Sequence, residues 1–153
     1  SYPISELGFG DLNLLVELST LMKKPLEPVN VCKSKKIYDL IDPIAKHLES
    51  LNDNYCRGSI VFSCLIAGQN IPVHTDYVYR KNESVTNFLD KMHRYHLVIT
   101  THDDVIFEDG GEKINMKVGE CWEINKKNIH AVYNPSNVDR IHLVIDTFSK
   151  DLV

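Results

Sequence analysis

The pattern of residue types changes at Gly58, and this change constrains the fold of the chain more than any other feature. Beyond this residue, short runs rich in β-branched and aromatic residues are separated by Gly, Asn, Asp and Pro, which is typical of strands joined by turns. Before it, helical spacing of apolar residues predicts two helices, over about residues 11–23 and 36–51. Pro43 should kink or split the second helix. Helices followed by strands, without βαβ alternation, predict a closed or double antiparallel sheet supported by N-terminal helices.

The strand pattern and the chain length together predict a single domain. About six strands are expected, over residues 58–66, 71–76, 94–101, 104–108, 112–118 together with 120–124, and 140–147. With 153 residues and 43% hydrophobic content, the chain can bury a sizeable core and is too short to expect two domains. We therefore predict one domain over residues 1–153, in which residues 1–57 form a helical support and residues 58–153 form a β core.

Charge and cysteine usage narrow the expected partners and compartment. The net charge of −4 arises from intermixed acids and bases, so neither nucleic acid nor a membrane is expected as a partner. The four cysteines lie far apart without a CxxC pair and are interpreted as reduced thiols. No apolar run approaches the roughly 20 residues that span a bilayer. These features indicate a soluble, cytoplasmic protein, and they leave the oligomeric state open.

Histidines are the residues best suited to carry chemistry, and six of the seven fall from His74 onward. His74 and Asp76 are two residues apart, so in an extended strand both side chains leave the same face. His130 follows a short polar turn near the start of a strand and is the best-placed third ligand. Two histidines and one carboxylate leave positions open for a co-substrate and O₂, as in non-haem iron(II) oxygenases. Zinc would accept the same three ligands.

Two arginines favour the iron oxygenase over a zinc site. Arg140 lies ten residues after His130 and begins a strand whose alternate residues are apolar, and Arg94 shares a strand face with His96. An arginine pairs bidentately with a carboxylate, and a dicarboxylate that chelates a metal at one end needs a cation at the other. The co-substrate that this pattern indicates is 2-oxoglutarate. A chance HxD triplet and a solvated face of an antiparallel sheet are the simpler alternatives.

The stretch from Ser63 to Asp146 resembles the aspartyl/asparaginyl β-hydroxylase family. Five pieces match in order across a little over half of the chain, namely residues 71–76, 94–97, 119–125, 130–134 and 140–146. The ten-residue step from His130 to Arg140 also fits the family pattern. The resemblance implies a double-stranded β-helix, which is a jelly roll related to the cupins. It also implies an Fe(II)- and 2-oxoglutarate-dependent dioxygenase that uses O₂ to hydroxylate an unactivated C–H bond.

The resemblance assigns expected roles to individual residues of the site. His74 and His130 would be iron ligands, and Asp76 would complete the metal-binding triad, although the vertebrate members of the family lack this carboxylate. The co-substrate residues that the resemblance implies are Arg140 and Ser63 for the far carboxylate of 2-oxoglutarate, with Arg94 and His96 as further support.

The substrate is left open by the sequence. Residues 77–93 form a longer segment than their counterpart in those vertebrate enzymes, which suggests a lid or a substrate-binding loop. The sequence is compatible with a small-molecule or peptide substrate, such as an Asp or Asn side chain of a peptide, a free amino acid or another compound. Two other functions are also compatible: a cupin-like metal enzyme that does not use 2-oxoglutarate, which would leave Arg94 and Arg140 unexplained, and a catalytically inactive binding module of the same fold.

Overall fold

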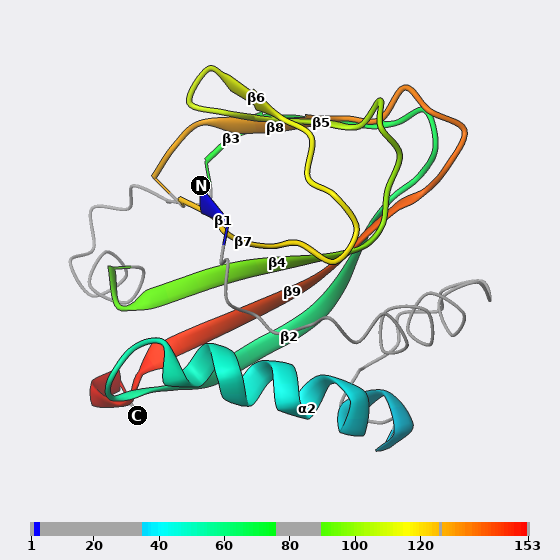
Figure 1. Ribbon diagram of the computed structural model, residues 1–153. Helices are drawn as coiled ribbons and strands as arrows, with labels where there is room; N and C mark the ends of the chain where they lie inside the picture. The colour runs from blue at the N-terminus through cyan, green and yellow to red at the C-terminus, as the bar shows by residue number, and fades with distance from the viewer. Residues whose placement is uncertain (1, 4–34, 76–89, 126, 153) are drawn as a thin grey trace.

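The described part of the computed structural model comprises residues 2–3, 35–75, 90–125 and 127–152. These residues form two antiparallel sheets that lie face to face, with one long helix against the outer face of the larger sheet (Figure 1). The helix predicted over residues 11–23 lies outside the described residues. No helix in the described part of the chain is long and apolar enough to cross a membrane.

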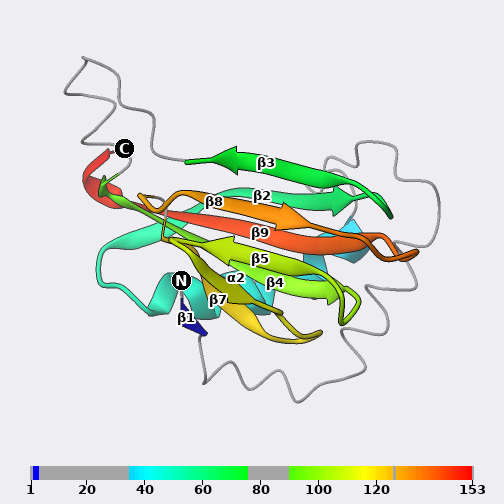
Figure 2. The ribbon, with the colours of Figure 1, turned by 90° about the horizontal axis from the view of Figure 1, so that it is seen from above.

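The two sheets have interleaved strand orders. The larger sheet runs in the order β1 (Tyr2–Pro3), β7 (Cys121–Glu123), β4 (Met92–Thr100), β9 (Arg140–Ser149) and β2 (Tyr55–Leu65). The smaller sheet runs in the order β3 (Asn70–His74), β8 (His130–Tyr133), β5 (Ile106–Asp109) and β6 (Glu112–Ile114). Helix α2 (Lys35–Ser50) precedes the strands, and a 3₁₀ turn (Lys150–Leu152) follows them. Strands far apart in sequence are neighbours in both sheets (Figure 2), which confirms the predicted double-stranded β-helix.

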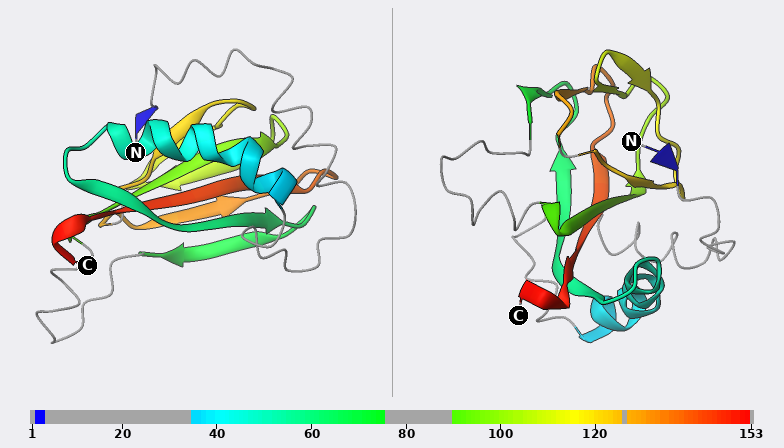
Figure 3. Two further views of the ribbon diagram at one scale, coloured as in Figure 1. Left: turned by 90° about the horizontal axis from the view of Figure 1, so that it is seen from below. Right: turned by 90° about the vertical axis from the view of Figure 1, so that its left-hand side faces the viewer.

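Strand β9 lies near the centre of the larger sheet, and its two faces lie in different environments. Ile141, Leu143 and Ile145 are buried in one core cluster, and full burial of such side chains stabilises a fold by about 1.5–3 kcal/mol each. Helix α2 contributes to this cluster the buried residues Ile41, Ile44 and Leu48. Figure 3 shows α2 on the outer side of the larger sheet, away from the smaller sheet. On the opposite face of β9, Arg140, Val144 and Asp146 line the cavity between the sheets, so the polar face of the strand points into the molecule rather than into solvent.

The structure differs from the sequence predictions about the elements at two places. Residues 112–118 and 120–124 were expected to form one run, but β6 and β7 belong to different sheets. Between them Gly119 has a φ of 86°, a conformation that glycine adopts without strain and that lets the chain cross between the sheets. Pro43 does not split α2, because it lies on the exposed side of the helix, where water can reach the carbonyl group that loses its partner.

Candidate functional site

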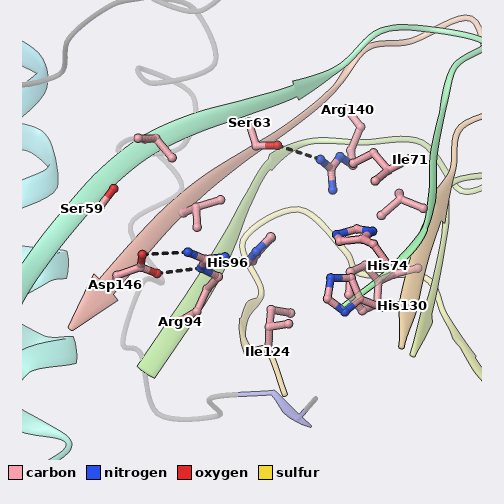
Figure 4. A pocket seen from close by; sticks show the side chains of 14 residues that line it. Ser59, Ser63, Ile71, His74, Arg94, His96, Ile124, His130, Arg140 and Asp146 are labelled. Atoms are coloured by element: carbon pink, nitrogen blue, oxygen red, sulfur yellow. Dashed lines mark hydrogen bonds and ion pairs between the residues drawn. The ribbon is translucent and has the colours of Figure 1, made fainter. Parts of the chain in front are cut away.

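A cavity of about 260 Å³ lies between the two sheets. Its apolar wall includes Phe107, Ile124 and Val132, and its polar groups come from strands of both sheets (Figure 4). Six of the seven residues predicted for the site line this cavity: Ser63, His74, Arg94, His96, His130 and Arg140. The seventh, Asp76, lies outside the described residues.

His74 and His130 meet because the two strands that carry them are neighbours in the smaller sheet. The two residues are paired in the register of β3 and β8, and paired residues of adjacent strands place their side chains on the same face. Their ring centroids are 4.3 Å apart. The ring of Phe107 stacks on His130 with centroids 5.6 Å apart, which restricts the rotation of this imidazole.

Backbone carbonyl groups fix the tautomers of both histidines. Nδ1 of His74 lies 2.7 Å from the carbonyl oxygen of Pro72, and Nδ1 of His130 lies 3.1 Å from that of Asn128. A carbonyl oxygen can only accept a hydrogen bond, so each Nδ1 carries the proton and each Nε2 keeps its lone pair. Metal-binding histidines are held in this way. The pair therefore fits a divalent metal ion, and the described residues contain no group of three or more potential ligands.

Arg140 is a buried cation without a carboxylate partner in the described part of the chain. Arg140 is 2% exposed. Its Nη2 donates a hydrogen bond to Ser63 Oγ at 3.2 Å, and its Nη1 donates one to His142 Nδ1 at 3.3 Å. Burial lowers the pKa of Arg140 to about 10, so the guanidinium stays charged at neutral pH. Because an unpaired buried charge is costly, this arrangement favours an anionic ligand in the cavity.

Arg94 differs from Arg140 because its charge is balanced within the protein. Arg94 and Asp146 are paired in the register of β4 and β9, and the guanidinium donates to the two carboxylate oxygens at 2.9 and 3.0 Å. The sequence indicated on which face of its strand each arginine lies but did not identify this ion pair, because the pair depends on the register between two strands. Asp146 is thus a cavity residue that the sequence analysis did not assign to the site. The role of Arg94 beside the co-substrate stays a prediction.

A family model described as aspartyl/asparaginyl beta-hydroxylase matches residues 32–150. The chain belongs to this family. The description of the family names a hydroxylase, and the histidine pair and the jelly-roll fold agree with membership. Among curated proteins, no sequence matches the chain.

Solved structures support the fold of this family member. The apo form of ThoJ, described as a non-heme monooxygenase, is 14% identical with a TM-score of 0.57, and the match covers 90% of this chain and 65% of that one. The nickel complex of ThoJ is 17% identical with a TM-score of 0.50, with 69% of this chain and 49% of that one covered. This chain thus spans less than two thirds of either ThoJ chain. At these identities the likeness concerns the fold alone.

The ion pair between Arg94 and Asp146 is expected to stabilise this β-hydroxylase family member measurably. The side chain of Asp146 is 7% exposed and that of Arg94 is 27% exposed, so Asp146→Ala would remove two hydrogen bonds and an opposite charge from a largely buried cation. We expect the free energy of unfolding to fall by about 2 kcal/mol, measured by urea denaturation. Asp39→Ala, which breaks the exposed ion pair with Lys35, should leave it unchanged. Equal effects of the two substitutions would contradict this assignment.

His142 is expected to make the stability depend on pH. Burial, the charge of Arg140 and the neighbouring His96 hold the pKa of His142 well below its usual value of 6.5. Below pH 6.5 the unfolded chain therefore binds a proton at this position that the folded protein does not, and the stability of the fold decreases as the pH falls. The slope from one such group is at most about 1.4 kcal/mol per pH unit. Urea denaturation between pH 7.5 and 5.5 should show this loss, and a smaller loss in His142→Asn.

Proposed function

We propose that this chain is an Fe(II)- and 2-oxoglutarate-dependent dioxygenase that hydroxylates an unactivated C–H bond. The observation that carries the proposal is the placement of two different binding groups in one cavity. A pair of histidines with unprotonated Nε2 atoms lies on the smaller sheet, and the buried guanidinium of Arg140 lies on the larger sheet (Figure 4). This arrangement suits a co-substrate that chelates a metal at one end and carries a carboxylate at the other.

Different residues of the cavity would bind the iron and the co-substrate. His74 and His130 would hold the iron through Nε2, with Asp76 as the third ligand. When bound, iron, 2-oxoglutarate and O₂ supply the oxidising chemistry, in which 2-oxoglutarate becomes succinate and CO₂ and one oxygen atom enters the substrate. Arg140 and Ser63 would bind the far carboxylate, and this ion pair would remove the cost of the buried cation.

The apolar side chains that line the cavity also support this proposal. Phe107, Ile124 and Val132 line the same cavity as the histidines, and such apolar side chains exclude water from the reacting groups and strengthen the ion pair at Arg140. We infer that the substrate is an Asp or Asn side chain of a peptide or a free amino acid, in keeping with the name of the family.

The proposal is tested by incubating the protein with Fe(II), ascorbate and 2-oxoglutarate and following succinate by NMR. Free amino acids and short peptides containing Asp or Asn are added one at a time, and the products are examined by mass spectrometry for a gain of one oxygen atom. We expect at least one compound to raise succinate formation and to gain oxygen. Binding of metal without binding or turnover of 2-oxoglutarate would instead indicate a cupin-like metal enzyme of another kind.

A further inference from the structure

One buried nitrogen atom lies between two residues that face the cavity. His142 lies on β9, is 2% exposed, and its Nδ1 is 3.0 Å from Nδ1 of His96 and 3.3 Å from Nη1 of Arg140. The rings of His96 and His142 are nearly perpendicular, at 89°, with centroids 5.3 Å apart. His96 and Arg140 line the cavity, and His142, which is not among the lining residues, contacts both of them.

The hydrogen-bonding chemistry of these groups allows one arrangement of protons. A guanidinium can only donate, so Nδ1 of His142 must accept and its proton must lie on Nε2. Nδ1 of His96 approaches the same acceptor and must carry a proton, because two nitrogen lone pairs would otherwise face each other. The lowered pKa of His142, caused first by burial and then by Arg140 and His96, agrees with a neutral ring. The tautomer of His96 is therefore set by His142.

We propose that His142 is a positioning residue for the co-substrate site. Its single acceptor atom holds the guanidinium of Arg140 and the ring of His96 in one geometry, so the anion-binding group and the neighbouring imidazole are oriented together. This inference rests on the proposed function, because it assumes that the ligand at Arg140 is a 2-oxoglutarate carboxylate. Ser63 holds only one terminal nitrogen of Arg140, so without His142 the guanidinium would lose one of its two partners among the described residues.

Three substitutions separate the acceptor atom from the rest of the ring. In His142→Asn, the side-chain oxygen is as many bonds from the backbone as Nδ1, so the acceptor is kept. In His142→Gln, the acceptor lies one bond further out, and in His142→Leu it is absent. The ligand probe is N-oxalylglycine, an inert analogue of 2-oxoglutarate, and its Kd is measured by calorimetry with Mn(II) bound. Visible absorption of bound Co(II) reports independently on the histidine pair of the smaller sheet.

We expect His142→Leu and His142→Gln to raise the Kd for N-oxalylglycine about tenfold or more, and His142→Asn to stay within about threefold of the parent protein. The Co(II) spectrum should be the same in all four proteins. An unchanged Kd in His142→Leu or His142→Gln would overturn the inference, as would an equal loss in His142→Asn. Failure of the parent protein itself to bind N-oxalylglycine with Mn(II) would overturn the proposed function, and the inference with it.

Discussion

Replacing His130 by alanine is expected to abolish stoichiometric metal binding and to lower substrate-coupled succinate formation by about 100-fold or more. The reason is geometric: Nε2 of His130 is the ligand atom that the carbonyl group of Asn128 orients and that the ring of Phe107 holds in place. His74→Ala should have the same effect because the two rings lie edge to face with their centroids 4.3 Å apart. Co(II) titration followed by visible absorption measures the binding, and NMR measures succinate.

A matched control for these variants is His102→Ala. His102 is also a histidine, but it lies in a turn before β5 and does not line the cavity. We expect its replacement to leave metal binding and turnover unchanged. Full metal occupancy in both His74→Ala and His130→Ala would mean that the ion binds elsewhere, and the assignment of the centre would be wrong.

Replacing Arg140 by methionine is expected to raise the concentration of 2-oxoglutarate required for half-maximal turnover by about 100-fold. Methionine keeps much of the length and apolar volume of the side chain but removes the charge, and loss of one partner from a buried charge pair costs about 2–5 kcal/mol in binding. The folded protein without ligand should change little in stability, within about 1 kcal/mol, because a costly buried cation is lost together with its hydrogen bonds. Initial rates at varied 2-oxoglutarate and urea denaturation measure the two effects.

Arg57→Met is the control for the loss of a positive charge. Arg57 pairs with Glu49 and Asp42 between β2 and α2 and does not line the cavity, so its replacement should leave the requirement for 2-oxoglutarate unchanged. If Arg140→Met behaved like this control, the cation at Arg140 would have no part in binding the co-substrate, and the proposed use of 2-oxoglutarate would lose its main support.

The strand faces that carry the candidate site residues follow from a pattern that is local in the sequence. The face of a strand follows directly from alternation, so the shared face of Arg94 and His96 could be predicted without knowing which strands are neighbours. That this face points into the cavity is a finding of the structure. Family membership of the chain confirms the resemblance that was seen in the order of the motifs. The role of Asp76 stays a prediction, because this residue lies outside the described part of the chain.

The features that the sequence did not predict depend on contacts between distant segments. The ion pair of Arg94 with Asp146 and the contact of His96 with His142 require the register of β4 against β9. Strand β8 has 4 residues and was not among the six predicted ranges, although His130 was placed near the start of a strand. It is held by β3 on one side and β5 on the other. Such short strands are stabilised by their neighbours rather than by their own sequence.

The most direct test of the central claim is a crystal structure with Mn(II) and N-oxalylglycine bound. We expect the metal against Nε2 of His74 and His130, the oxalyl group beside the metal, and the far carboxylate against Arg140 and Ser63. A metal bound away from the histidine pair, or a far carboxylate that contacts Arg94 or solvent instead of Arg140, would contradict the proposed dioxygenase site.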